Sequence, residues 1–248
     1  MTSVADIEKF IDSVAPFETM EPWDNSGFQL GDRDSVVKRC VLTLDVTGKT
    51  AKFAVDNSAE LILSHHPLIF NPLSNIPADS TVAKLIKNGV SVISAHTCFD
   101  KAKGGISEQL ALRLGLSDVS STEDGFVAVG ELKEKMTLKD FASFTAKTLN
   151  CSGLRYTDID AEIKRVAVCG GAGEEFLELA KSCADCFVTG DVKYHTMLDA
   201  AEAGYPVVSA GHFETEYGSF LALIPKLQEA FSDVEFIPAP QKNPVAAV

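Results

Sequence analysis

Strand-like and helix-like hydrophobic patterns alternate along almost all of this 248-residue chain, and this alternation constrains its fold more than any other feature. Apolar runs typical of strands span residues 36–47, 59–66, 90–97, 125–133, 154–157, 163–171, 186–191, 205–212 and 234–239. Segments with helical spacing span residues 3–16, 48–59, 79–89, 105–116, 136–150, 173–184, 192–204 and 214–231. Because a helix between two strands favours their parallel pairing, we expect helix-covered sheets that are mostly parallel or mixed. The sequence therefore predicts an α/β fold.

The polar stretch "DVSSTED", residues 118–124, separates two halves of this pattern. A chain of this length fits one large α/β domain or two compact ones. We therefore predict two α/β lobes, residues 1–122 and residues 123–248. Within them, Ser3 and Thr137 precede helical segments and are expected to act as N-caps.

Composition, charge and the first residues disfavour several classes of protein. The formal net charge is −13, which disfavours nonspecific binding to phosphate backbones. No apolar run approaches the roughly 18 residues that a membrane span needs. The first ten residues lack the pattern of a signal peptide, and the six cysteines lack a disulfide rhythm, so we expect reduced thiols in a cytoplasmic protein.

Histidines gather where strands are expected to end. His65 and His66 follow one strand-like run, His96 follows the next, and His212 follows the run that begins at residue 205. In open α/β sheets, ligands bind beyond the carboxyl ends of the strands. The fifth histidine, His195, lies in the helical segment after residue 191.

The adjacent pair His65–His66 has two interpretations when it is considered alone. In a regular strand the two rings would point to opposite faces, but at a strand end before Pro67 both can turn toward one rim. The pair then binds metal, or it consists of two polar residues that bond to nearby carbonyls.

Two carboxylates occupy positions that could join these histidines. Asp100 follows its strand by a few residues, although a loop aspartate commonly caps a turn or pairs with a lysine. Glu216 lies four residues after His212, and on a helix this spacing places both side chains on one face, as in a metal clamp. An ordinary helix start would explain the glutamate but not the histidine.

Three imidazoles and two carboxylates form a donor set for Zn, Fe, Mn, Co or Ni rather than calcium. Five protein ligands exceed the three that one catalytic zinc normally uses. Two ions about 3.5–4 Å apart, bridged by one carboxylate, would use all five and leave positions for water.

Five segments together resemble the signatures of the Nif-three-like dinuclear metal-centre family, also labelled GTP cyclohydrolase 1 type 2 homologs. They are "PWDNSGFQLGD", "LILSHHPLIF", "SAHTCFDKAKGG", "TGDVKYH" and "SAGHFETE". The resemblance covers the whole chain in order. It implies two lobes of related topology, two metal ions in the cleft between them, and a toroidal homohexamer. Its ligand motif matches His65, His66, Asp100, His212 and Glu216, whereas Cys98 stands where the family commonly has asparagine.

Several further motifs allow two interpretations. Asp24 and Asn25 line the site or form an Asx turn before Gly27. "CGGAGEEF", residues 169–176, lacks the spacing of a dinucleotide fingerprint, so we interpret it as a turn into a helix rather than a phosphate loop. "CADC", residues 183–186, has redox spacing but is expected to pack in the core.

Two functional hypotheses follow from these residues. In the first, the protein is a metal-dependent hydrolase of a nucleotide or other polar small molecule, and His96 or His195 moves a proton to the leaving group. Both histidines also fit a buried structural role. In the second, the protein is a metal-holding scaffold or regulatory protein that acts through a partner, without turnover.

Overall fold

The computed structural model describes residues 1–246, and the chain forms two compact units. The first contains Met1–Ala102 and Phe220–Gln241, and the second contains Lys103–Ser219 and the segment from Lys242. Each has its own β-sheet covered by helices, so the predicted α/β class is confirmed.

The first unit is built on a five-stranded sheet with the order β1-β4-β3-β2-β11. Its strands are β1 (Gly27–Leu30), β2 (Arg39–Thr43), β3 (Leu61–Ser64), β4 (Ser91–Ser94) and β11 (Glu235–Pro238). Strands β4, β3, β2 and β11 run parallel, and β1 pairs antiparallel with β4. The carboxyl ends of β3 and β4 therefore lie side by side at one edge of the sheet.

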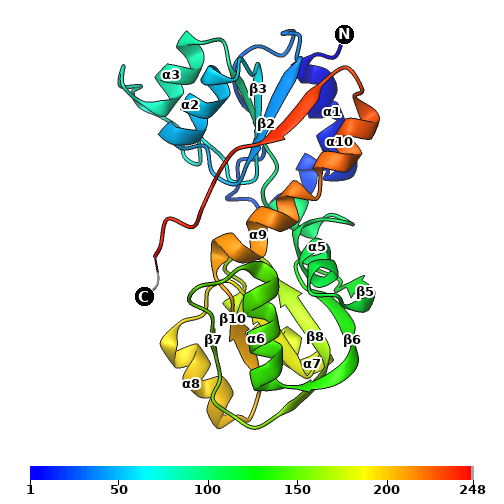
Figure 1. Cartoon of the computed structure of the whole chain (residues 1–248). Helices are drawn as coiled ribbons and strands as arrows, with labels where there is room; N and C mark the ends of the chain where they lie inside the picture. Colours follow the sequence, from blue (N-terminus) through cyan, green and yellow to red (C-terminus); the bar gives the residue numbers. More distant parts are fainter. Residues whose placement is uncertain (247–248) are drawn as a thin grey trace. The chain divides into compact units, whose positions relative to one another are not determined.

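Helices cover both faces of this sheet (Figure 1). They are α1 (Val4–Val14), α2 (Gly48–Asp56), α3 (Thr81–Lys87), α4 (Thr97–Lys101) and α10 (Ile224–Ala230). Successive strand residues point to opposite faces. Val41 and Ile62 pack with Ala51 of α2 and Leu85 of α3 in one buried cluster, which is why strands buried on both sides appear as continuous apolar runs.

The second unit has a six-stranded mixed sheet with the order β5-β6-β8-β9-β10-β7. Its strands are β5 (Ser117–Ser121), β6 (Ala128–Thr137), β7 (Arg155–Tyr156), β8 (Glu162–Cys169), β9 (Cys186–Thr189) and β10 (Val207–Ser209). Only β8, β9 and β10 run parallel; the other neighbours pair antiparallel. The parallel part again brings strand ends to one edge.

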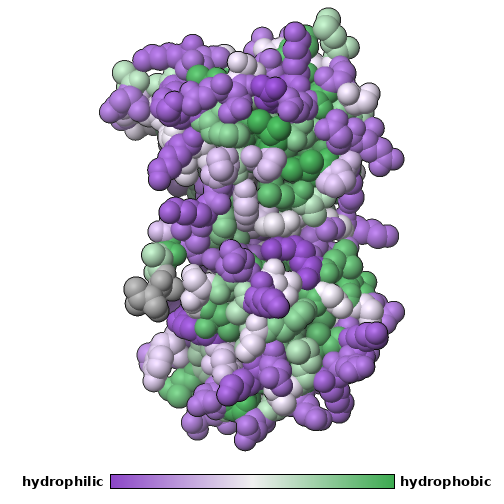
Figure 2. All heavy atoms as spheres, viewed as in Figure 1, coloured by the Kyte–Doolittle hydropathy of each residue, from purple (hydrophilic) through white to green (hydrophobic). Residues whose placement is uncertain are grey.

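The helices of the second unit are α5 (Ile106–Arg113), α6 (Leu138–Leu149), α7 (Leu177–Cys183), α8 (Tyr194–Glu202) and most of α9 (His212–Leu221), whose last two residues belong to the first unit. Phe141 of α6 packs with Val166 and Val188 on one face of the sheet. On the other face, Phe187 packs with Ala180 of α7. Hydrophilic side chains surround the periphery of each unit in Figure 2.

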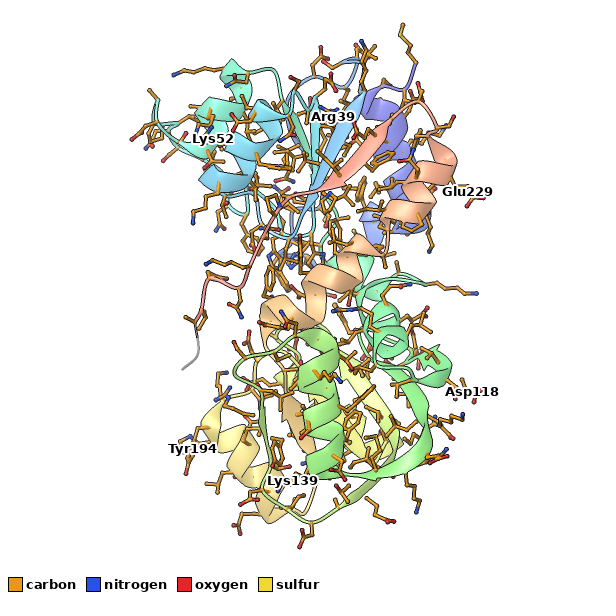
Figure 3. All side chains as sticks on the ribbon, viewed as in Figure 1. Arg39, Lys52, Asp118, Lys139, Tyr194 and Glu229 are labelled. Atoms are coloured by element: carbon orange, nitrogen blue, oxygen red, sulfur yellow. The ribbon has the colours of Figure 1, made fainter. Side chains whose placement is uncertain are left out.

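Most of the predicted elements are confirmed. Ser3 caps α1 and Thr137 caps α6 by accepting a hydrogen bond from a backbone N–H of the first turn, as expected. The sequence did not predict β1 or β5. The strand β5 overlaps the polar stretch of residues 118–124; it is an exposed edge strand, and its Asp118 points away from the unit (Figure 3).

The division of the chain also differs from the predicted boundary between residues 122 and 123. The chain leaves the first unit after Ala102 and returns at Phe220, because β11 completes the first sheet by pairing with β2. None of the helices in residues 1–246 combines the length and apolar character that crossing a membrane requires.

Candidate metal site

Three histidines of the first unit converge at the edge where β3 and β4 end. His65 and His66 directly follow β3, and His96 lies two residues after β4. One ring nitrogen from each of the three lies within 4.8 Å of those of the other two. Parallel pairing of β3 with β4 produces this convergence, because it aligns the two strand ends.

His65 is buried, and the carbonyl of Ala95 fixes its ring. Nδ1 lies 2.8 Å from that oxygen. A carbonyl only accepts hydrogen bonds, so Nδ1 carries the proton and Nε2 presents its lone pair. Nε2 lies 3.5 Å from Oδ1 of Asp100, which α4 brings to the same edge.

Carboxylates hold the other two histidines of the first unit in the same manner. Nδ1 of His66 lies 2.8 Å from Asp45, and Nδ1 of His96 lies 2.8 Å from Asp24. Metal-binding histidines usually donate their second N–H to a carboxylate or carbonyl, which fixes the tautomer and the ring orientation. All three rings at this edge therefore have a fixed orientation, which both metal binding and proton transfer require.

Asp24 accepts several hydrogen bonds besides that of His96. The backbone N–H and hydroxyl of Thr97 both donate to its Oδ2, and the backbone N–H of Asn25 donates to Oδ1. Burial alone would raise the pKa of Asp24, but the bonds from His96 and Thr97 outweigh it and hold the pKa well below its usual range. Asp24 is therefore an ionised anchor for His96.

The second unit presents a histidine and a carboxylate on one helix. His212 opens α9, and its Nε2 lies 3.0 Å from Oε2 of Glu216, so the predicted four-residue spacing places both on one helix face. Nδ1 of His212 lies 2.8 Å from Oδ2 of Asp191, which follows β9. This ring is thus held by a carboxylate as His66 and His96 are.

Glycines let two loops approach this helix closely. A Cβ atom on Gly171 would lie 2.1 Å from Oε1 of Glu216, and one on Gly190 would lie 2.7 Å from Cα of His212. Gly171 of the segment "CGGAGEEF" therefore packs closely against Glu216, and the segment leads into α7, in agreement with its interpretation as a turn into a helix.

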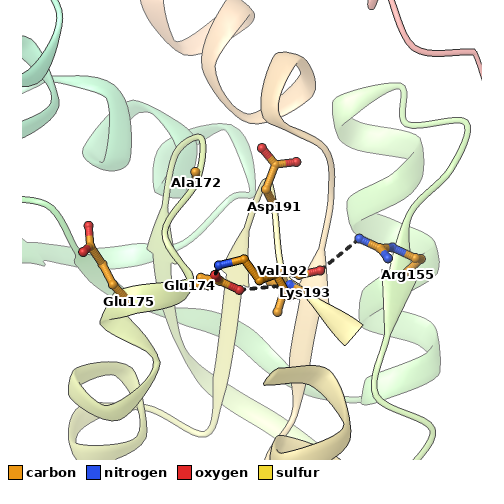
Figure 4. A pocket seen from close by; sticks show the side chains of 7 residues that line it. All are labelled: Arg155, Ala172, Glu174, Glu175, Asp191, Val192 and Lys193. Carbon is orange, nitrogen blue, oxygen red and sulfur yellow. Dashed lines mark hydrogen bonds and ion pairs between the residues drawn. The ribbon is translucent and has the colours of Figure 1, made fainter. Parts of the chain in front are cut away.

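The loop that carries Asp191 borders a pocket of about 580 Å³ in the second unit (Figure 4). Nη2 of Arg155 donates to the carbonyl of Val192 at 3.2 Å. Glu174 accepts a hydrogen bond from the backbone N–H of Lys193 at 3.0 Å and also pairs with its ammonium group, which lowers the pKa of Glu174. The peptide group between Val192 and Lys193 is thus fixed at both its carbonyl and its N–H.

The donor atoms within each unit have the spacing of ligands on one ion. Two nitrogen or oxygen ligands about 2.1 Å from a metal lie about 3.0–3.4 Å apart in octahedral or tetrahedral geometry. Nε2 of His65 lies 3.5 Å from Oδ1 of Asp100, and Nε2 of His212 lies 3.0 Å from Oε2 of Glu216. Both distances are within or close to this range. The residues present therefore fit a divalent transition metal.

The structure separates the remaining candidates. His195 is exposed on α8, against the ring of Tyr194, so it is not a buried structural histidine. Cys98 is buried in α4, and burial raises its pKa to about 11, so it is a neutral thiol. Cys186 is buried on β9, as expected for core packing.

Asp45 and Asp191 are the site residues that the sequence did not single out. Each follows its strand by two residues, as His96 follows β4. An aspartate at a strand end was an available signal, but the histidine that it faces lies 21 residues further along the chain in both cases.

The fold and these side chains define a class of protein: a two-unit α/β protein with histidine and carboxylate groups that could hold metal. Residues 2–244 match the family described as Duf34/NIF3 (NGG1p interacting factor 3). The chain belongs to this family, as its sequence motifs predicted.

Relatives support the same assignment. The chain is 37% identical over 246 residues to a Clostridium perfringens protein named GTP cyclohydrolase 1 type 2 homolog, with 94% of each chain covered. It is 32% identical over 240 residues to a Helicobacter pylori protein named GTP cyclohydrolase 1 type 2, also with 94% of each covered. A Staphylococcus aureus hypothetical protein of solved structure superposes with a TM-score of 0.93 at 26% identity, over 99% of both chains.

Proposed function

We propose that the protein binds two divalent metal ions through His65, His66, Asp100, His212 and Glu216. We further propose that it hydrolyses a nucleotide or another phosphorylated or polar small molecule. One observation carries the proposal: Nδ1 of each of these histidines bonds to a carbonyl or carboxylate, which leaves Nε2 as the ligand atom.

The chemistry of the donor set favours a catalytic role. Bound ions would supply Lewis acidity toward water and toward a phosphoryl or carbonyl oxygen at neutral pH. Imidazole and carboxylate ligands suit Zn, Fe, Mn, Co or Ni. The names of the relatives, which refer to GTP cyclohydrolase, support a nucleotide as the substrate class.

His96 is proposed to move a proton to or from the substrate. Its ring lies among those of His65 and His66, and Asp24 holds its Nδ1, so that Nε2 can accept or release the proton. His195 was the second candidate for this role. Its exposure on α8 makes it the weaker one, because proton transfer needs a ring held in position next to the substrate.

The test uses protein reconstituted separately with each of the five metals, a panel of nucleotides and phosphoesters, and direct measurement of bound metal. Glu216→Gln should lose metal and turnover. Glu214→Gln is the matched control, because Glu214 lies on the same helix but bonds to Asn243. Unchanged turnover in Glu216→Gln would refute the site. Tight metal retention without turnover on any substrate would instead favour the scaffold role.

We also infer a cytoplasmic location and assembly into a homohexamer. The location is supported by the six cysteines, all of which are free thiols. The hexamer is an implication of the family resemblance, and light scattering of the purified protein measures it directly.

A further inference from the structure

Two aromatic side chains of the first unit are exposed next to each other. Trp23, the only tryptophan of the chain, is 59% exposed, and Phe70 is 44% exposed. Their ring centroids are 5.9 Å apart with an angle of 36° between the ring planes. Single exposed apolar residues are common, whereas two large exposed rings in contact with each other form a contiguous aromatic surface on which a ligand can stack.

His96 connects this aromatic pair to the candidate metal ligands. Its ring centroid lies 6.0 Å from that of Trp23 and 6.3 Å from that of Phe70, and both aromatic rings meet it at 70°. The same imidazole lies 5.2 Å from the ring of His65 and 5.4 Å from that of His66. A molecule bound on Trp23 and Phe70 would therefore be separated from His65 and His66 only by the imidazole of His96.

The segments that carry the two rings are fixed in place by their neighbours. Asn25 donates a hydrogen bond from Nδ2 to the carbonyl of Ile69 at 2.6 Å, and Gln29 accepts one from the N–H of Ile69 at 3.1 Å. Asp24 is tied to His96 and Thr97. Because these bonds link the segment of Trp23 to that of Phe70, little freedom remains to be lost when a ligand binds.

We propose that Trp23 and Phe70 bind a planar heteroaromatic ring of the substrate, with the polar part of the substrate directed to His96. A flat ring gains stacking energy on aromatic faces in addition to buried area, which an aliphatic group does not. This inference rests on the proposed function, because it assigns the ring to the substrate of the same site.

The single tryptophan makes the proposal measurable, because all tryptophan fluorescence comes from Trp23. Metal-loaded and metal-free protein are titrated with the nucleoside 5′-monophosphates and with ribose 5-phosphate, which keeps the sugar phosphate but lacks the ring. We expect saturable quenching by at least one nucleotide and none by ribose 5-phosphate at the same concentration.

Variants then test the two rings. Phe70→Leu keeps an apolar side chain and removes the ring; it should raise the Kd of that nucleotide on the order of tenfold. Phe144→Leu is the matched control, since Phe144 on α6 is 36% exposed and lies in the second unit. For Trp23→Leu, equilibrium dialysis replaces fluorescence and should show a similar loss. Circular dichroism establishes that each variant is folded.

Three results would overturn the inference. They are equal binding of ribose 5-phosphate and the nucleotides, an unchanged Kd in Phe70→Leu, and a concentration-dependent blue shift of Trp23 emission that shows burial against a second copy of the chain. Metal content is measured in the same samples. Retained metal without ring binding refutes this inference alone, whereas absence of metal binding refutes the proposed function.

Discussion

The Nδ1 atom of His212 lies 2.8 Å from Oδ2 of Asp191, and this contact sets the direction of the opposite ring nitrogen toward Glu216. We predict that Asp191→Ala weakens metal binding about 10- to 100-fold, because the ring loses its fixed orientation and part of its basicity. Competition with a chromophoric chelator measures this affinity. Asp199→Ala, an exposed aspartate of α8, should bind metal like the wild type; equal affinity in both variants would contradict the assigned role.

His96 provides a second prediction, which separates ligation from proton transfer. His96→Gln should keep its metal content but lower turnover about 10²- to 10⁴-fold, because a positioned general acid or base contributes that much. Metal analysis and steady-state kinetics on the same sample give the two quantities. Loss of one ion per chain would show that His96 is a ligand.

Gly204 provides a matched control for a substitution at Gly171 in the same unit. Gly171 and Gly204 both adopt positive φ, +63° and +67°, but a Cβ on Gly204 would have no atom within 4 Å. Alanine at either position should cost about 1 kcal/mol of unfolding free energy from backbone strain. Only Gly171→Ala should also lose metal, because its Cβ displaces Glu216. Urea unfolding and metal analysis check the two effects, and metal retained by Gly171→Ala would refute the second.

The thiols of "CADC" give a fourth prediction. Redox-active cysteines have lowered pKa values, but burial raises the pKa of both Cys183 and Cys186. We therefore expect Cys186 in the native protein to react with a thiol reagent only as fast as the protein opens, and all six cysteines to react after denaturation. Rapid native labelling of Cys186, located by mass spectrometry, would contradict this.

The sequence predicts individual elements of this fold well because hydrophobic period and capping are local properties. The capping bonds of Ser3 and Thr137 are confirmed. An edge strand such as β5 has no hydrophobic period to recognise, because most of its side chains are exposed and polar. The pairing of distant segments is not a local property either: Glu235 pairs with Arg39, 196 residues away.

The candidate site is predictable in part for the same reason. Strand-end histidines and the spacing of His212 and Glu216 are local patterns, and they identify the proposed ligands. The partner of each imidazole is not a local property. Asp45 reaches His66 and Asp191 reaches His212 only after the neighbouring strand and its loop are in place.

The position of β11 has a consequence for the synthesis of the chain. All strands of the second sheet have been made once Ser209 is added, whereas the first sheet waits for Glu235–Pro238. Until then β2 has an unpaired edge, which is a template for association with other chains. The first sheet, whose strands β1 to β4 precede the second sheet in the chain, is therefore the later of the two to be completed, and the edge of β2 stays open during that interval.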